Sequence, residues 1–302
     1  MEYLSDGNLR LPKWAKSKIG SRGSIHKMKE VLRREGLHTV CEEASCPNIG
    51  ECFSKPTATF MIMGNLCTRN CGFCDVTPGT PKLLDIDEPV KIARVSKQLG
   101  LRHVVITSVT RDDLHDGGAG HFGSTIKELR NAIPEASIEV LTPDFKGDVA
   151  LLEPIARERP DIFNHNIETV PRLYSSVRPQ ADYERSLKIL KGMKRLEPRI
   201  ITKSGIMLGL GEKREEILSV MDDLRTVGCD LLTIGQYLRP SRQNLPVVEY
   251  VEEELFAEYG DIARKKGFLH VASAPLVRSS FNAEEFRKIS GRWAVASGQQ
   301  DR

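Results

Sequence analysis

The chain has 302 residues, of which 40% are hydrophobic and 28% charged, and its formal net charge is +3. This composition is typical of a globular protein, and no apolar stretch approaches the length needed to cross a bilayer, which argues against a membrane protein. The first residues lack the basic start and apolar centre of a secretory signal, so we expect the seven cysteines to stay in a reducing compartment without forming disulfides.

Positive charge gathers near the N-terminus, where nine Lys or Arg and the single acid Glu30 lie between Arg10 and Arg34. Such a run is usually a solvated surface, but it also suits the docking of an acidic partner or a transit peptide. The second half of the run has the apolar spacing of an amphipathic helix, which Ser24 would cap and Gly36 would end.

From about residue 58, short apolar runs alternate with longer amphipathic stretches, the pattern of repeated βα units. The predicted strands are 59–63, 103–107, 138–141, 161–164, 205–208, 231–234 and a last one at 268–271, and predicted helices include 89–99, 122–132, 183–193 and 215–227. Right-handed crossovers would curl six such units into a partial (β/α)6 barrel of the α/β class, with its active site at the C-terminal ends of the strands. We expect one compact unit of three parts: an N-terminal extension (1–57), the partial barrel (58–272) and a C-terminal segment (273–302).

Three cysteines, Cys67, Cys71 and Cys74, follow the first predicted barrel strand with the spacing Cys-x3-Cys-x2-Cys. A structural zinc site uses four protein ligands, and no fourth Cys or His lies near in the sequence. Three thiolates on a [4Fe–4S] cluster would instead leave one iron open to a small molecule, which suggests catalysis. A zinc site and unligated core thiols are the alternatives.

Three more cysteines, Cys41, Cys46 and Cys52, precede the barrel with the spacing Cys-x4-Cys-x5-Cys. They too lack an obvious fourth ligand, so we predict a second [4Fe–4S] cluster in the N-terminal extension. The seventh cysteine, Cys229, stands before a predicted core strand and is expected to be a buried thiol.

The spacing of Cys67, Cys71 and Cys74, with the aromatic Phe73 before the last cysteine, resembles the signature of the radical S-adenosylmethionine (SAM) superfamily. The resemblance implies a partial barrel in which the amino and carboxylate groups of SAM chelate the open iron. An electron from the cluster then cleaves the sulfonium to a 5′-deoxyadenosyl radical, and this radical abstracts hydrogen from the substrate.

The same resemblance suggests which residues contact SAM. Phe73 would touch the adenine or pack in the core, and Gly209 belongs to a strand and turn on which members of the superfamily lay the adenine. Arg178 would bind the SAM carboxylate in a bidentate pair, or form a structural salt bridge. Asn164 and Asn166 would contact the ribose or methionine part, or fix the structure of their loop.

Longer matching runs narrow the resemblance to the lipoyl synthase family. They include Cys-Glu-Glu-Ala-Ser-Cys-Pro-Asn, Ala-Thr-Phe-Met-Ile-Met-Gly, Phe-Asn-His-Asn-Ile-Glu and Gly-Gln-Tyr-Leu-Arg-Pro-Ser, and the similarity extends from about Pro12 to Phe281. The resemblance implies the radical insertion of two sulfur atoms at carbons 6 and 8 of a protein-bound octanoyl-lysine. Two SAM molecules are used per product, and the cluster of the N-terminal extension, called the auxiliary cluster, is consumed as the sulfur source.

In that family the auxiliary cluster takes a fourth, serine ligand from a C-terminal Arg-Ser-Ser-Tyr motif, which here reads Arg278-Ser279-Ser280-Phe281. We expect Ser280, the serine before the aromatic residue, to be that ligand, and Ser279 is the alternative. A hydroxyl beside three soft thiolates binds iron weakly, which suits a cluster that must open and give up sulfur. Without the family, both serines would be turn or cap residues.

The resemblance also implies partners. The substrate is an octanoylated lipoyl carrier domain, from the E2 component of a 2-oxoacid dehydrogenase or from the glycine cleavage H protein. Flavodoxin or ferredoxin supplies electrons, and a cluster-repair protein would rebuild the auxiliary cluster. No nucleic-acid or membrane partner is implied, and the expected location is the cytoplasm, with an organelle matrix as the alternative.

Two other functions fit parts of the sequence. Another radical enzyme that inserts sulfur, such as a methylthiotransferase, would use Cys67, Cys71 and Cys74 on a different substrate. A non-catalytic, zinc-stabilised protein could bind nucleic acid through its basic N-terminal run. Iron and sulfide content separates the zinc protein from the two enzymes, and an octanoylated peptide substrate separates the enzymes from each other.

Overall fold

The structure, a computed structural model, describes residues 12, 14, 22–46, 48–52 and 57–280. These residues form an eight-stranded sheet in the order β1 to β8. The strands are β1 (His38–Thr39), β2 (Thr57–Ile62), β3 (His103–Ser108), β4 (Ser137–Leu141), β5 (Ile162–Asn164), β6 (Ile201–Leu208), β7 (Leu231–Gln236) and β8 (His270–Ser273). Only β1 and β2 pair antiparallel, and every later pair is parallel. Because β8 does not pair back to β1 or β2 in the described part of the chain, the sheet curves without closing.

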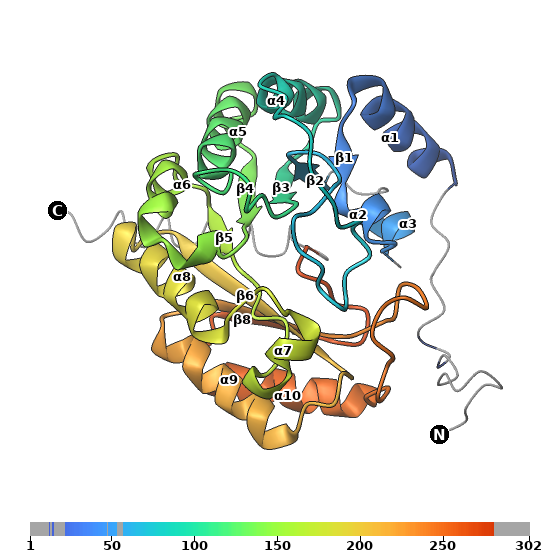
Figure 1. Cartoon of the computed structure of the whole chain (residues 1–302), viewed down its shortest axis with the longest axis vertical. Coiled ribbons are helices and arrows are strands. Elements are labelled where there is room, and N and C mark those ends of the chain that lie inside the picture. The colour runs from blue at the N-terminus through green and yellow to red at the C-terminus, as the bar shows by residue number, and fades with distance from the viewer. Residues whose placement is uncertain (1–11, 13, 15–21, 47, 53–56, 281–302) are drawn as a thin grey trace.

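Six helices follow the parallel strands and cover the outer face of the curved sheet (Figure 1). They are α4 (Glu88–Gln98), α5 (Ala119–Ala132), α6 (Glu153–Arg157), α8 (Tyr183–Leu196), α9 (Arg214–Thr226) and α10 (Glu253–Lys265). Each connects one parallel strand to the next, as crossover connections require. The predicted partial (β/α)6 barrel with one additional last strand is therefore confirmed.

Shorter elements complete the architecture. α2 (Val40–Glu43), α3 (Ile49–Cys52), α7 (Tyr174–Val177) and the 3-10 turns η2 (Phe145–Gly147), η3 (Val149–Leu152) and η4 (Pro171–Leu173) connect the larger ones. At the N-terminal end, α1 (Arg22–Glu35) begins before Ser24, so the prediction that Ser24 caps this helix was wrong. Gly36 ends it with a φ of 68°, as predicted. The rest of the basic run that starts at Arg10 lies mostly outside the described residues.

The inner and outer faces of the sheet differ in character, because successive side chains of a strand point to opposite faces. On the outer face, residues such as Phe60, Ile106 and Val140 join the main core beneath the helices. On the inner face, Val105, Ile162, Ile201 and Leu231 form a separate small core. Around this core the inner face carries buried polar side chains such as Glu139 and Lys203, and we call the interior of the barrel that these side chains fill the lumen.

Strand β6 shows why the lumen was hard to predict. It runs from Ile201 to Leu208, four residues longer at its start than the predicted strand 205–208. The added residues include Thr202, Lys203 and Ser204, all polar and all buried. A run of polar residues carries no apolar strand signal, so the prediction began only at Gly205.

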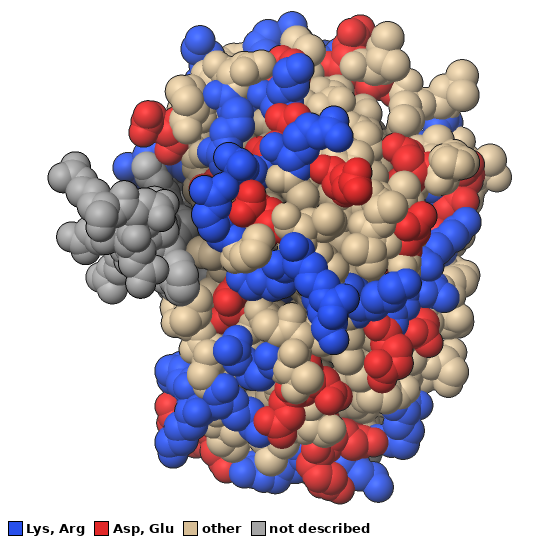
Figure 2. Space-filling view, turned by 90° about the vertical axis from the view of Figure 1, so that its left-hand side faces the viewer, with Lys and Arg blue, Asp and Glu red and all other residues tan. Residues whose placement is uncertain are grey.

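Charge on the surface is mixed where Figure 2 shows it. On this face, which carries α6 and α8, Lys and Arg side chains form a band with Asp and Glu side chains between and beside them. A mixed surface produces no extended field of one sign. Among the described residues, no helix is both long enough and apolar enough to cross a membrane.

Candidate active site

The loop that leaves the C-terminal end of β2 carries Cys67, Cys71 and Cys74. It folds back on itself, since the amide of Cys67 donates to the carbonyl of Thr77 over 2.9 Å and the carbonyl of Cys67 accepts from the amide of Gly79 over 2.8 Å. Burial, with a contribution from the charge of Cys67, raises the pKa of Cys71 and raises that of Cys74 to about 12. The three half-buried thiols therefore share one electrostatic environment at the mouth of the barrel.

Two backbone amides point at the sulfur of Cys67. They belong to Arg69, at 3.4 Å, and to Thr110 in the loop after β3, at 3.3 Å. Hydrogen bonds to cysteine sulfurs are one of the means by which a protein tunes an iron–sulfur cluster. The surroundings of Cys67 thus suit a thiolate ligand.

Arg69, between the first two of these cysteines, ties the loop to the barrel. Its Nε donates to Asp112 over 2.7 Å, its Nη2 donates to Asp144 over 2.6 Å, and its side chain is only 4% exposed. Burial alone would raise the pKa of Asp144, but the guanidinium outweighs it and the pKa falls to about 2. No motif signals this clamp in the sequence, because its two acids lie 43 and 75 residues further along the chain.

A second anchor comes from the loop between β7 and α10. There the side-chain amide of Asn244 donates to the carbonyl of Cys74 over 2.8 Å, and the backbone amide of Leu245 donates to the carbonyl of Gly72 over 2.9 Å. A Cβ atom on Gly72 would lie 2.9 Å from the Leu245 side chain, so the glycine permits this close approach. Tyr237 holds the same loop, since its hydroxyl donates to the carbonyl of Leu245 over 2.8 Å.

Buried polar groups without partners lie beside the cysteine loop. Arg178 donates through Nη1 to the carbonyl of Asn166 over 2.9 Å, and its positive charge lowers the pKa of Cys71 against the effect of burial. The Nε of Arg178 and the Oδ1 of Asn166 are buried and have no hydrogen-bond partner among the described residues. Because buried polar atoms are normally satisfied, these two atoms are candidates to bind a polar ligand, and Arg178 lies close enough to Cys71 to act on its pKa.

The other predicted SAM contacts lie in different surroundings. Phe73 packs at the mouth of the barrel against an apolar cluster that contains Val177, Leu210 and Tyr237. Asn164 is buried in the lumen, where its Nδ2 donates to Glu139 over 3.1 Å. The structure therefore places Arg178 close enough to Cys71 to act on its pKa, with Asn166 beside Arg178, and it places Asn164 deeper.

Gly209 has a reason for being glycine that does not involve the cysteines. Its φ is +106°, and a Cβ atom there would lie 2.1 Å from the Gln236 side chain and 2.5 Å from the carbonyl of Glu249. It also borders a hollow that is lined by Ile217 of α9 and Tyr259 of α10. Close packing against the end of β7 thus accounts for this glycine.

The other three cysteines lie on short helical segments beside β2. Cys41 is in α2, Cys46 follows it, and Cys52 ends α3. A hydrogen bond with Cys41 lowers the pKa of Cys46 to about 6, helped by the backbone of Asn48 and by the charge of Arg278. The same bond, with burial and the charge of Cys52, raises the pKa of Cys41. The three thiols are close enough to influence one another, as ligands of one cluster must be.

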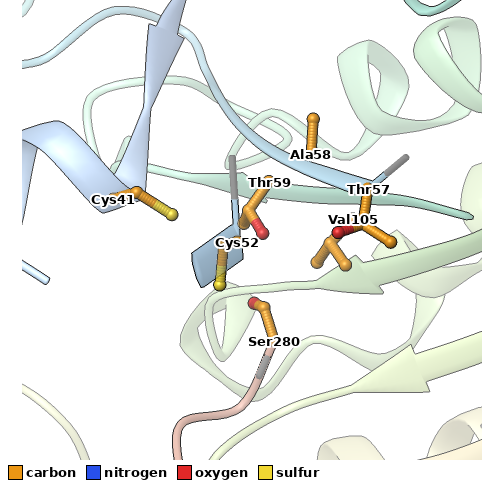
Figure 3. Close-up of a pocket in the computed structure, with 7 residues that line it drawn as sticks. All are labelled: Cys41, Cys52, Thr57, Ala58, Thr59, Val105 and Ser280. Atoms are coloured by element: carbon orange, nitrogen blue, oxygen red, sulfur yellow. The ribbon is translucent and has the colours of Figure 1, made fainter. Parts of the chain in front are cut away.

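Ser280 reaches this group from the opposite end of the chain. It lines one pocket with Cys41 and Cys52, and Thr57, Thr59 and Val105 form the neighbouring wall. In Figure 3 the hydroxyl of Ser280 and the sulfur of Cys52 face each other, and the sulfur of Cys41 points into the same space. The pocket lies beside the first residues of β2, whereas Cys67, Cys71 and Cys74 follow the last ones.

Ser279 is engaged elsewhere. Its hydroxyl accepts a hydrogen bond from Nδ2 of Asn166 over 2.5 Å, and its carbonyl accepts one from Nζ of Lys203 over 2.5 Å. Both contacts direct Ser279 toward the strands β5 and β6. The two neighbouring serines therefore contact different parts of the protein, and of the two only Ser280 borders the pocket with Cys41 and Cys52.

The sulfur positions differ from those of a single-metal site. Within the described ranges, no three His, Cys, Asp or Glu side chains converge closely enough to hold one metal ion. In a [4Fe–4S] cluster each cysteine binds a different iron, so the sulfurs must be spaced around a cube of atoms. Cys229, by contrast, is fully buried, its pKa is raised to about 12 by burial, and its thiol donates to the carbonyl of Leu231, as expected of a buried thiol.

Two family models match the chain. The model of the radical SAM superfamily matches residues 61–224, and the model of the N-terminal domain of lipoyl synthase of the radical SAM family matches residues 3–46. The lipoyl synthase of Caldanaerobacter subterraneus subsp. tengcongensis is 56% identical over 276 residues, which cover 91% of this chain and 96% of that protein. The lipoyl synthase of Caldicellulosiruptor saccharolyticus is 54% identical, over 92% of this chain and 98% of its own length.

Solved structures share the fold at much lower identity. Methylornithine synthase superposes with a TM-score of 0.54 at 13% identity, over 86% of this chain and 80% of that one. The FeFe-hydrogenase maturase HydG from Carboxydothermus hydrogenoformans superposes with a TM-score of 0.57 at 12% identity, over 89% and 79% of the two chains. These similarities support the assignment of the barrel.

Proposed function

We infer the roles of individual residues from one premise: the chain belongs to the lipoyl synthase family of the radical SAM superfamily. Members of this family insert two sulfur atoms into a protein-bound octanoyl group by radical chemistry, and they use SAM and a [4Fe–4S] cluster. The sequence alternatives of a methylthiotransferase and of a zinc-stabilised nucleic-acid-binding protein are therefore set aside. One observation carries the detailed proposal: two cysteine triplets lie at opposite ends of β2, and a serine borders one of them.

Cys67, Cys71 and Cys74 would hold the radical-generating cluster. They supply three thiolates, so one iron stays open for the amino and carboxylate groups of SAM. When bound, this cluster and SAM supply the radical that removes hydrogen from an unactivated carbon, which acid–base groups of a protein cannot do. The residues around the loop fix its shape: Arg69 anchors it to the loops that follow the strands β3 and β4, and Asn244 anchors its last cysteine.

Arg178 and Asn166 would bind the polar part of SAM. A guanidinium pairs with a carboxylate through two parallel hydrogen bonds, and the unpartnered Nε of Arg178 is available for one of them. Phe73, in the apolar cluster at the mouth, would provide a surface for the adenine. Gly209 and Asn164 stay predictions as SAM contacts, because the amide of Gly209 donates to Glu212 and the side chain of Asn164 donates to Glu139.

Cys41, Cys46, Cys52 and Ser280 would hold the auxiliary cluster, which gives both sulfur atoms to the product. The hydrogen bond with Cys41 lowers the pKa of Cys46, which favours its thiolate, the form that binds iron. The hydroxyl of Ser280 is a harder and weaker ligand for iron than a thiolate. It is therefore the ligand that most easily leaves when sulfur is removed.

Partners and the organisation of the chain follow from the same premise. The substrate is an octanoylated lipoyl carrier domain, and we propose the E2 component of a 2-oxoacid dehydrogenase or the glycine cleavage H protein as its source. Flavodoxin or ferredoxin would deliver electrons, a repair protein would restore the auxiliary cluster, and the reaction would take place in the cytoplasm. Residues 1–57, 58–272 and 273–302 would act as one unit, with the first and last parts completing the auxiliary site.

An octanoylated carrier peptide tests this function directly. The anaerobically reconstituted protein, given the peptide, SAM and a reductant, should produce a peptide in which two hydrogens are replaced by two sulfurs. Two molecules of 5′-deoxyadenosine should form for each product. A product with a methylthio group or no sulfur at all would contradict the proposal.

A further inference from the structure

The segment that ends in Ser280 crosses the lumen of the barrel. We call residues Ala274–Ser280 the strap. The amide of Ala274 donates to the carbonyl of Ile234, and the carbonyl of Pro275 accepts from the amide of Gln236, each over 3.1 Å. A Cβ atom on Gly235 would lie 2.1 Å from the carbonyl oxygen of Val277, so this glycine lets the strap lie against β7. From there the strap reaches the pocket beside β2 and β3.

Three side chains hold the strap on its way. Nδ2 of Asn48, between two auxiliary cysteines in sequence, donates to the carbonyl of Leu276 over 2.7 Å. Nδ2 of Asn166 and Nζ of Lys203 both bind Ser279, one at its hydroxyl and one at its carbonyl. The carbonyl of Ser279 belongs to the planar peptide group that leads to Ser280. Lys203 therefore holds the unit from which the Ser280 side chain starts.

Lys203 is itself held in place by a buried ion pair. Its Nζ lies 2.9 and 3.2 Å from the two carboxylate oxygens of Glu139, and neither side chain is exposed. Glu139 also accepts from Nδ2 of Asn164 over 3.1 Å, and His103 lies 3.7 Å away. A buried ion pair of this kind contributes little net stability compared with apolar residues of similar size. The role of this ion pair is therefore to be found in the groups that it positions rather than in the stability of the fold.

We propose that Lys203, oriented by Glu139, is a positioning residue of the auxiliary site: by fixing the carbonyl of Ser279, it directs the hydroxyl of Ser280 toward Cys41 and Cys52. The proposal rests on the proposed function, because it takes Ser280 as a ligand of the auxiliary cluster. Residues of the barrel lumen, on β4 and β6, then determine whether Ser280 can bind the auxiliary cluster.

Mössbauer spectra of iron-57 test the proposal in a protein that holds only the auxiliary cluster, with Cys67, Cys71 and Cys74 replaced by Ala. An iron with an oxygen ligand has a different isomer shift from irons bound by thiolate. The pair of substitutions Lys203→Met and Glu139→Gln removes both charges and so leaves no unpaired carboxylate in the lumen. We expect this variant to lose the oxygen-ligated iron signal, as Ser280→Ala should, while it keeps about four irons per chain.

Two further variants complete the series. Lys203→Arg keeps a charged donor and should retain most of the signal. The side chain in Lys203→Gln is too short to reach Ser279, so this variant should lose the signal. It tests the proposal even if the double variant does not fold. Ser137→Ala, which removes another buried hydroxyl on the inner face of β4, is the matched control and should leave the spectrum unchanged.

Activity gives a second readout. With all cysteines intact, the double variant should cleave SAM in the absence of substrate at a rate within twofold of the parent, but form at least tenfold less lipoyl product. The oxygen-ligated signal could be lost in Ser280→Ala but unchanged in the double variant and in Lys203→Gln. That result would overturn the role of Lys203 and leave the serine assignment intact. An unchanged signal in Ser280→Ala would overturn the serine assignment, and the present inference with it.

Discussion

Asn244 donates a hydrogen bond to the carbonyl oxygen of Cys74 over 2.8 Å, although the two residues are 170 positions apart in the chain. This contact joins the end of the loop that carries Cys67, Cys71 and Cys74 to the loop that follows the strand β7. Ser241 in turn fixes the Asn244 side chain, since its hydroxyl donates to Oδ1 over 2.7 Å. The geometry of the proposed radical-generating site is therefore set by residues from distant parts of the barrel.

Replacing Asn244 with Ala should loosen the position of Cys74. The loss of one hydrogen bond to a half-buried carbonyl costs about 1.4 kcal/mol, which corresponds to a factor of about ten. We expect SAM cleavage without substrate to slow by about this factor, measured as 5′-deoxyadenosine formed under reducing conditions. Gln243→Ala changes an exposed neighbour and should have no effect. Equal rates in the two variants would show that the contact does not matter for the site.

Arg69→Lys should destabilise the protein. The guanidinium binds Asp112 and Asp144 at once, and an ammonium group cannot reproduce this fork. The loss of one buried, charged hydrogen bond costs about 2 kcal/mol, which should appear as a lower midpoint of unfolding in urea. Arg94→Lys, at an exposed pair with Glu35, is the control and should leave the midpoint nearly unchanged. Equal midpoints for both variants would count against the clamp.

The two triplets should fail in different ways. Cys41→Ala should remove the auxiliary cluster, so bound iron falls from about eight to about four per chain, while SAM is still cleaved reductively. No lipoyl product should form. Cys229→Ala changes the seventh cysteine, which is buried away from both triplets, and should keep both clusters and full activity. Abolished SAM cleavage in Cys41→Ala would mean that the roles of the triplets were assigned the wrong way round.

His165 should make the protein sensitive to mild acid. Burial, with the nearby charge of Arg178, lowers its pKa from 6.5 to about 4, so the folded state keeps this ring neutral. The unfolded chain binds the proton first, and stability is therefore lost as the pH falls from about 6.5 to about 4. Between pH 7 and pH 5 the loss amounts to about 2 kcal/mol.

The variant His165→Gln should lack this part of the pH dependence. Urea unfolding of the parent, of His165→Gln and of the exposed control His115→Gln at pH 7 and pH 5 measures the effect. The gap in stability between the parent and His165→Gln should narrow at pH 5. If the gap stays constant, while His115→Gln follows the parent, a lowered pKa of His165 is contradicted.

The sequence was informative where one residue type or a short spacing carries the chemistry. The cysteine spacings and the succession of βα units are local patterns, so the barrel and both triplets could be predicted before any contact was known. Boundaries were reliable where an apolar run begins and ends, as in the strand β3, whose observed range exceeds the prediction by one residue. The serine motif was found only through its resemblance to a family.

Contacts between distant residues could not be predicted. Arg69 reads as an ordinary basic residue, because its two acids become visible only in the folded barrel. Lys203 belongs to a polar stretch that hides its strand, and its partner Glu139 is 64 residues away. The reason for Gly235 is equally distant, since the strap that packs on it comes from the end of the described chain. In each case the partner residue comes close only in the folded chain, and no local sequence pattern indicates it.

The central claim is that one cluster generates radicals and the other supplies sulfur. Reconstitution of the protein with sulfur-34 sulfide, followed by a single round of reaction with an octanoylated carrier peptide, SAM and a reductant in unlabelled buffer, tests it most directly. Mass spectrometry should find sulfur-34 at both new positions and no more than one lipoyl group per chain. A product that carries unlabelled sulfur, or repeated turnover without added sulfide, would contradict the account.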